Sequence, residues 1–253
     1  MVNEVMHLRF YGLTDRGKQR ENNEDYIYVS NVIDDLKLFI VADGMGGANA
    51  GEVASKDALE SVEGYIKSEF PKIQHEKENI EELIRKSIVR ANKYVFEKSK
   101  TMPEYKGMGT TIVVVLIYKG KVYIGHVGDS RVYRFRKHVI RQLTKDHSYV
   151  QELVKEGTIT REEAKNHPQK NILLKVIGCE KNVDPDVISK GFIKDDIILI
   201  CTDGLTNMLD EKDIYETIMK HKTYLKDACK ALIDNANLLG GYDNISVVLI
   251  SND

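Results

Sequence analysis

The run LFIVADGMGG, residues 38–47, decides how the rest of this sequence is interpreted. Mostly apolar residues, several of them β-branched or aromatic, lead into a carboxylate and then into glycines, which is typical of a buried strand that ends in a turn. Asp43 therefore lies where the backbone leaves the core. The glycines let the chain turn tightly and bring main-chain carbonyls close to whatever Asp43 binds. A rigid strand that presents an acid in this way suits a cation.

The same pattern occurs three more times in the chain. Apolar runs end in Asp129 and in Asp203, and Asp243 stands two residues before the apolar run ISVVLI, residues 245–250. An aspartate next to a strand is usually part of a turn, and each acid taken alone could have that role. Four acids at four strand ends instead favour a common site.

Length and composition describe an ordinary globular protein. The 253 residues are 42% apolar and 30% charged, which is enough to build a sizeable core. A formal charge of −2 gives no reason to expect nucleic acid or an anionic membrane as a partner. Only four prolines are present, and no low-complexity tract suggests a linker. We therefore expect one domain over residues 1–253 and no binding to nucleic acid.

The cysteines and the N-terminus indicate the compartment. The three cysteines form no CxxC pair and are odd in number, which is typical of free thiols in a reducing compartment. The first residues contain no signal-peptide hydrophobic stretch, and the longest apolar run, residues 110–118, is too short to span a bilayer. We expect a cytoplasmic protein with no membrane insertion.

The order of elements predicts the fold class. Strands are followed by two long helices, more strands, two further helices (the last over residues 223–239) and a final strand, with another strand expected over residues 183–192. This order does not repeat a βαβ unit, so it predicts an α+β fold of mainly antiparallel sheets with helices stacked outside. The pattern of residues 145–171 predicts short helices between β regions. These helices form either a mobile flap or a surface excursion without a role.

The four acids predict metal chemistry if they converge. Carboxylates that share a dry pocket need cations, because like charges raise one another's pKa. An oxygen-only ligand set selects Mg²⁺ or Mn²⁺. Asp43 could bridge two ions, with the Gly44 carbonyl as a further ligand, and a water held between the ions would become the nucleophile. Such a site suits phosphoester hydrolysis. The polar segment 14–25 is either a solvated loop or a substrate approach, in which Arg20 would bind the phosphate.

Seven stretches in order along the chain resemble the motifs of the metal-dependent protein phosphatase family, the protein phosphatase 2C type, in its bacterial form. Each stretch is modest alone, and the ordered set is specific and spans nearly the whole chain. The stretches are TDRG with RENNED (residues 14–17 and 20–25), VADGMGG (41–47), GMGTT (107–111), GDSR (128–131), LTKDHS (143–148), CTDG (201–204) and DNIS (243–246).

The resemblance implies a fold and an activity. The fold would be a central antiparallel β-sandwich with helices on both outer faces, in four layers, with a helical flap at about residues 145–171. The activity would be hydrolysis of phosphoserine and phosphothreonine in proteins by a metal-bridging hydroxide, without a phosphoenzyme. The family uses two Mn²⁺ or Mg²⁺ ions, with a third in bacterial members. Its partners here would be phosphorylated proteins, among them a Ser/Thr kinase and its targets, and we expect a monomer.

The resemblance also assigns roles to individual positions. Asp25 would orient a metal-bound water, Arg20 would bind phosphate, and Asp129 would hold a third ion together with Asp203. The remaining implied ligands are Asp43 as the bridge, the main chain of Gly44, and Asp203 and Asp243 for the second ion.

One departure concerns the general acid. Eukaryotic relatives often have a histidine after the Asp-Gly pair, whereas this chain has Met45, whose thioether cannot donate a proton. The general acid is therefore unassigned. His147 is a weaker candidate, for which a role in flap structure is favoured, and the strand histidine His126 is expected to be packed rather than catalytic.

Two other functions fit the same motifs. One is a catalytically inactive, metal-binding interaction module, although no core acid is missing. The other is a phosphatase that acts on a phosphorylated anti-sigma-factor antagonist or on a small phosphoester.

Overall fold

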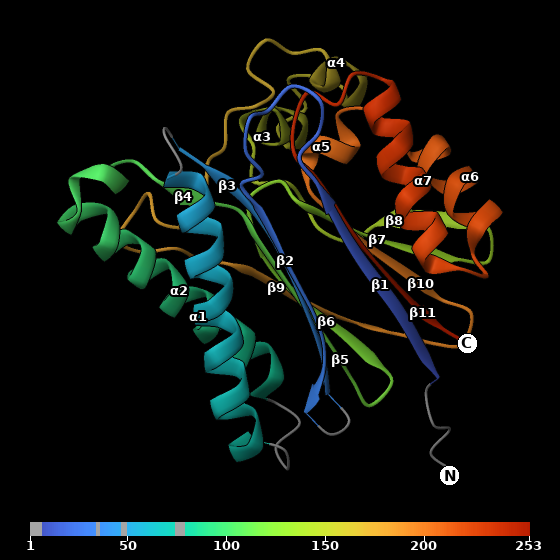
Figure 1. Ribbon diagram of the computed structural model, residues 1–253, viewed down its shortest axis with the longest axis horizontal. Coiled ribbons are helices and arrows are strands. Elements are labelled where there is room, and N and C mark those ends of the chain that lie inside the picture. Colours follow the sequence, from blue (N-terminus) through green and yellow to red (C-terminus); the bar gives the residue numbers. More distant parts are fainter. Residues whose placement is uncertain (1–6, 34–35, 47–49, 74–78) are drawn as a thin grey trace.

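A computed structural model describes residues 7–33, 36–46, 50–73 and 79–253. Two antiparallel sheets pack face to face, with a pair of helices outside each sheet (Figure 1). This arrangement is the predicted four-layer α+β fold. Gly47, the third glycine of the run at residues 44–47, lies outside the described residues. So do the N-terminal residues 1–6, on which the prediction that there is no signal peptide partly rests.

The first sheet contains the chain's first and last strands side by side. Its order is β1 (Leu8–Asp15), β11 (Ile245–Asn252), β10 (Ile197–Cys201), β7 (Arg131–Arg136) and β8 (Val139–Gln142). The outer face of this sheet packs against α6 (Glu211–His221) and α7 (Leu225–Leu238) through a core cluster that includes Leu199, Leu232 and Leu249.

The second sheet holds the apolar run that ends in Asp43. Its order is β2 (Asp25–Ile33), β3 (Leu36–Met45), β5 (Ile112–Tyr118), β6 (Lys121–Val127) and β9 (Asp186–Gly191), and the short β4 (Gly109–Thr110) pairs with β3. The outer face is covered by α1 (Ala50–Ile73) and α2 (Ile80–Thr101).

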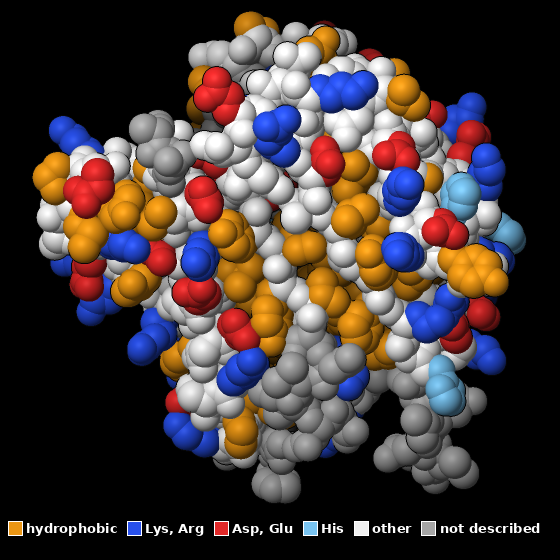
Figure 2. All heavy atoms as spheres, viewed as in Figure 1, with side chains coloured by type: hydrophobic (Ala, Val, Ile, Leu, Met, Phe, Trp, Pro, Cys, Tyr) orange, Lys and Arg blue, Asp and Glu red, His pale blue; other side chains and the backbone are white. Residues whose placement is uncertain are grey.

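The layers are held together by three apolar clusters. The cluster between the sheets contains only β-strand and strand-edge residues, among them Phe39, Val113 and Ile198, all fully buried. Apolar side chains are visible along the middle of the face in Figure 2, between the two helical layers, and charges of both signs are spread around them. No helix among the described residues is long and apolar enough to cross a membrane.

Shorter helices complete the chain, and two predicted boundaries need correction. These helices are η2 (Pro103–Tyr105), α3 (Tyr149–Lys155), α4 (Arg161–Lys165) and α5 (Asp203–Thr206). The N-cap of the last helix is Tyr224, one residue after the predicted cap Thr223, and the Tyr224 side chain makes no capping bond. The predicted strand over residues 183–192 is shorter, β9 at Asp186–Gly191, because only these residues pair with β6.

Candidate metal centre

The strand registers bring the predicted acids to one edge of the sandwich. In the first sheet, Cys201 pairs with Val247, so Asp203 after β10 and Asp243 before β11 leave the sheet at the same end. In the second sheet, Ile112 pairs with Val127, and Asp43 lies at the same end of the neighbouring strand. The acids are far apart in sequence. Antiparallel pairing brings them to one end within each sheet, and the packing of the two sheets makes them neighbours.

The acids line one cleft between the two sheets. Its volume is about 220 Å³. The side chains of Asp43 and Asp203 are within hydrogen-bonding reach of each other. The full lining is Arg20, Glu24, Asp43, Gly44, Met45, Gly46, Thr111, Asp129, Asn171, Leu173, Asp203 and Asp243. Every predicted ligand is in this set, together with Arg20, while Asp25 is buried beneath the cleft at 3% exposure.

The main chain at Asp43 is held by the GMGTT motif. The Asp43 carbonyl accepts bonds from the Thr110 hydroxyl and the Thr111 amide, both at 2.8 Å, and the Asp43 amide donates to the Thr111 hydroxyl at 3.2 Å. The Thr111 hydroxyl also bonds Ser130 of the GDSR motif at 2.8 Å. These bonds fix the backbone from which the Asp43 carboxylate projects, because they leave its peptides little freedom.

Gly44 is required by a close approach of the backbone. A Cβ atom at this position would lie 2.2 Å from the carbonyl oxygen of Gly51 in α1 and 2.7 Å from that of Glu24. Any side chain would therefore push α1 away from the end of β3. The glycine lets the main chain of the Asp-Gly pair reach the cleft wall, where its carbonyl is available as a ligand.

Asp25 is held by one oxygen and presents the other. Its Oδ2 accepts bonds from Ser246 at 2.7 Å and Thr202 at 2.9 Å, whereas Oδ1 is buried without a partner in the described part of the chain. Burial is the main cause that raises the pKa of Asp25 to about 7. A buried acceptor without a partner at the base of a polar cleft is a good position to bind a water.

The acids repel one another. Burial, followed by the charges of Asp25 and Asp203, raises the pKa of Asp43 well above its ordinary value. Burial, followed by the charge of Asp203, raises the pKa of Asp129 to about 8. Burial and the charge of Asp243 raise the pKa of Asp203. All three shifts have the same physical origin, which is negative charge in a poorly solvated space.

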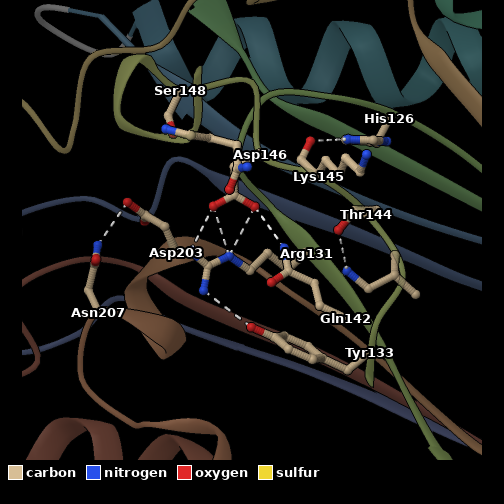
Figure 3. Close-up of polar contacts among 12 residues, drawn as sticks. His126, Arg131, Tyr133, Gln142, Thr144, Lys145, Asp146, Ser148, Asp203 and Asn207 are labelled. Atoms are coloured by element: carbon tan, nitrogen blue, oxygen red, sulfur yellow. Dashed lines mark hydrogen bonds and ion pairs between the residues drawn. The ribbon is translucent and has the colours of Figure 1, made fainter. Parts of the chain in front are cut away.

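Nearby arginines do not balance this charge. Arg20 donates to Asp243 Oδ2 at 2.8 Å. Arg131 forms a two-pronged pair with Asp146, with Nη2 2.7 Å from Oδ2 and Nε 3.1 Å from Oδ1, and Figure 3 shows this carboxylate between Arg131 and Gln142. Each arginine thus pairs with one acid. Within the described residues, Asp43, Asp129 and Asp203 have no arginine partner. An excess of carboxylate oxygens in one cleft fits hard divalent cations such as Mg²⁺ and Mn²⁺.

Several residues that build the site were missed in the sequence. Glu24 lines the cleft beside Asp25, and only its place in the acidic RENNED stretch could have indicated this. Thr202 and Ser246 hold Asp25. They belong to the CTDG and DNIS motifs, but no role was predicted for them. Asn244 joins three loop segments by bonding the carbonyls of Arg16 and Asn22 and the amide of Glu24.

The histidines lie away from the cleft lining. His126 is 3% exposed and its Nε2 lies 2.9 Å from the Lys145 carbonyl, so it is packed as predicted. His147 is also buried, and the helix after it is capped by Ser148, whose hydroxyl accepts from the Gln151 amide. Met45 lines the cleft. None of these side chains supplies an acid group to the cleft, so the general acid is still unassigned.

Comparison with known proteins identifies the family. The protein phosphatase 2C family matches residues 14–238. The "Serine/threonine phosphatase stp" of Listeria monocytogenes is 42% identical over 98% of this chain and 96% of its own length, and the protein phosphatase PhpP of Streptococcus pneumoniae is 36% identical over 94% and 95%.

Solved structures agree with this match. The serine/threonine phosphatase of S. agalactiae superposes with a TM-score of 0.90 at 38% identity, covering 98% of this chain and 100% of that one. The catalytic domain of the phosphatase PstP, solved in complex with two manganese ions, gives 0.84 at 29% identity, covering 98% and 99%. The resemblance, the fold and the enzyme class predicted from the motifs are confirmed, and the chain belongs to the protein phosphatase 2C family.

Proposed function

We propose that this phosphatase hydrolyses phosphoserine and phosphothreonine in proteins at the cleft lined by Asp43, Asp129, Asp203 and Asp243. The observation that carries the proposal is the convergence of these four acids, of which Asp43, Asp129 and Asp203 have no matching positive charge among the described residues. In the proposal, Asp43, Asp203, Asp243 and the Gly44 carbonyl hold two ions, and Asp129 shares a third with Asp203. When bound, Mg²⁺ or Mn²⁺ supplies Lewis-acid activation of the phosphoryl group and of the attacking water.

Arg20 binds the phosphoryl oxygens of the substrate in this proposal. Half of its side chain is exposed, at 52%, and it lies at the cleft mouth against Asp243. A planar guanidinium presents two parallel donors to a phosphate. Arg20 can turn from Asp243 to the substrate, because its long side chain is held by a single ion pair at the surface.

Asp25 orients the attacking water. Thr202 and Ser246 fix its Oδ2, so the unpaired Oδ1, which lies close enough to Asp203 and Asp243 to be affected by their charges, keeps one position. A hydrogen bond from a water to this oxygen orients the water, and the carboxylate can accept the proton that the water loses. No side chain of the chain needs to become phosphorylated.

The proposed biological setting follows the family resemblance. The substrates are phosphorylated proteins, among them a Ser/Thr kinase and its targets, and the enzyme acts in the cytoplasm as a monomer made of one domain, residues 1–253. Residues 145–171, which carry α3 and α4, act as the flap beside the cleft. Asn171 and Leu173, at and just after the end of this segment, contribute to the cleft wall.

The test is hydrolysis of phosphoserine and phosphothreonine peptides by purified protein after chelation, with Mn²⁺ or Mg²⁺ added back. Chelation should abolish turnover, add-back should restore it, and Asp43→Asn and Asp243→Asn should be inactive and bind fewer ions by calorimetry. Turnover that is indifferent to chelation would refute the proposal. An inactive protein that still binds Mn²⁺ would instead favour the interaction-module alternative, and faster turnover of a phosphorylated regulator than of peptides would favour the second alternative.

A further inference from the structure

His147 makes a reciprocal pair of hydrogen bonds with Gly128, the residue before Asp129. The His147 amide donates to the Gly128 carbonyl at 2.9 Å, and the Gly128 amide donates to His147 Nδ1 at 3.2 Å. Gly128 has a φ of +108°, and a Cβ atom there would lie 2.6 Å from Thr111 Cβ. His147 therefore holds the peptides on both sides of Gly128: its ring accepts from the amide before this residue and its main chain donates to the carbonyl that leads into Asp129, while the positive φ between them is strained for other residues.

The His147 ring is itself held in place. It stacks on His126 with ring centroids 4.6 Å apart and an interplanar angle of 11°, and His126 is anchored by its bond to the Lys145 carbonyl. On the outer side, His147 Nε2 lies 3.4 Å from Asp186 Oδ1. Asp186 is the register partner of His126 across β6 and β9, so residues of two paired strands lie against the ring, although its Nε2 makes no hydrogen bond among the described residues.

His126, His147 and Asp186 also form a group of possible metal ligands, whose nitrogen and oxygen atoms lie within 4.8 Å of one another. The geometry argues against an ion there. Nearly parallel stacked rings cannot both direct a lone pair at one ion, because an ion in the plane of one ring lies out of the plane of the other. His147 Nδ1 accepts a bond from Gly128, so the neutral ring carries its proton on Nε2, the atom that faces Asp186.

The same histidine joins the flap to the site. Its carbonyl accepts a bond from the Leu174 amide at 2.7 Å, and the next residue, Ser148, forms a bridge with Leu173. Leu173 lines the cleft. His147 therefore contacts both the peptide before Asp129 and the segment that returns from the flap to the cleft wall.

We infer that His147 is a positioning residue, whose Nδ1 atom fixes the Gly128 peptide and thereby the direction of the Asp129 carboxylate. The inference rests on the proposed role of Asp129 in holding the third ion. Groups that orient ligands from outside the coordination sphere typically change metal affinity or activity about 10-fold to 100-fold when lost.

Two substitutions separate this role from general packing. In His147→Asn, Oδ1 takes the place of Nδ1 and can still accept the Gly128 amide. In His147→Gln, the amide group extends toward Asp186 and leaves Gly128 without an acceptor. His167, which lies half-buried in the flap and whose Nδ1 also accepts a backbone amide, that of Gln169, supplies the matched control pair His167→Asn and His167→Gln away from the cleft lining.

The first readout needs neither metal nor activity. Hydrogen exchange of the Gly128 amide, followed by NMR in the metal-free protein, should stay within about 3-fold of wild type in His147→Asn and accelerate at least about 10-fold in His147→Gln, as expected for a lost protecting bond. The second readout is Mn²⁺ binding by calorimetry. The affinity of the weakest Mn²⁺ site and kcat should each fall about 10-fold in His147→Gln. Both should be largely kept in His147→Asn. Both His167 variants should match wild type.

The third readout is coupling to Asp129. In an Asp129→Asn background, His147→Gln should have little further effect on Mn²⁺ binding or kcat, because the carboxylate that it positions is gone. Equal behaviour of the Asn and Gln variants, or an undiminished His147→Gln effect in that background, would overturn the inference. If Asp129→Asn alone changes neither Mn²⁺ binding nor kcat, the proposed role of Asp129 fails and the inference fails with it.

Discussion

Replacing Asp129 with asparagine should stabilise the metal-free protein while it impairs the metal-loaded enzyme. The pKa of Asp129 is raised from 3.8 to about 8 by burial and by Asp203. A carboxyl whose pKa is higher in the folded state destabilises the fold once pH exceeds its unfolded pKa. The Asp129 carboxyl therefore does not lower the unfolding free energy below about pH 4, and it lowers it progressively as pH rises to about 8.

The size of the effect follows from the shift. At full weight it corresponds to about 5 kcal/mol of lost unfolding free energy at pH 8 and to less than about 2 kcal/mol at pH 5. The Asp129 side chain is only partly buried and reaches the water of the cleft, so we take a third to a half of these values. Asp129→Asn should then gain about 2 kcal/mol at pH 8, which is about 4 to 8 °C in Tm for a chain of this size.

The assay is thermal and urea unfolding in chelator at pH 5 and pH 8, repeated with saturating Mn²⁺. Asp234→Asn, at an exposed acid on α7, is the matched control and should change stability little at either pH. With Mn²⁺ the order should reverse, because wild type gains more from binding the ion. An Asp129→Asn protein that is no more stable than wild type in chelator at pH 8, or whose gain is equal at pH 5, would refute the electrostatic argument.

Two further substitutions test the parts of the cleft that do not hold metal. Arg20→Ala should raise KM for phosphopeptides about 10-fold or more with the bound metal retained, because it removes charge-assisted bonds to phosphate; calorimetry that shows metal loss would contradict its assignment. Asp25→Asn should lower kcat about 10-fold to 100-fold with little change in KM or Mn²⁺ count, since it removes a positioned proton acceptor; unchanged kcat from pH 6 to 9 would remove the role proposed for Asp25.

Much of this fold could be predicted from the sequence because local signals and global order agree. The apolar run before Asp43 predicts a strand by composition, and Asp203 and Asp129 repeat the pattern. The distribution of helices between groups of strands predicts the layers. The convergence of the acids follows once the strands are antiparallel, because strand ends that alternate in direction meet at the same edge of the sandwich.

The sequence could not predict which side chains hold the acids in place. Thr202 and Ser246 bond the same oxygen of Asp25, but Thr202 follows β10 and Ser246 lies in β11, and these strands become neighbours only in the folded sheet. The Arg131–Asp146 pair joins residues 15 positions apart across β7 and the start of the flap. Contacts of this kind depend on register and on rotamers, which no periodicity in the chain reports.

The start of the last helix was mispredicted for a related reason. Thr223 is a favourable N-cap by residue type, yet the helix begins at Leu225. The Thr223 carbonyl accepts a bond from Arg9 Nη1 at 2.6 Å, which ties this residue to the N-terminal strand. The last helix thus begins at a different residue from the one that local preference predicts, and a long-range contact lies at this end of the helix.

The hydrogen bonds around the cleft explain how mutually repelling acids persist in one place. Asp43 is held through its main chain by Thr110 and Thr111, so the backbone that carries its carboxylate cannot move away without breaking three bonds. Asp25 is fixed by two hydroxyl groups. Each net hydrogen bond contributes about 1 kcal/mol, and together these offset a repulsion of similar size. These bonds keep the mutually repelling acids in place, so loss of a supporting hydroxyl such as that of Thr202, which holds the water-orienting Asp25, should lower kcat more than it lowers the stability of the fold.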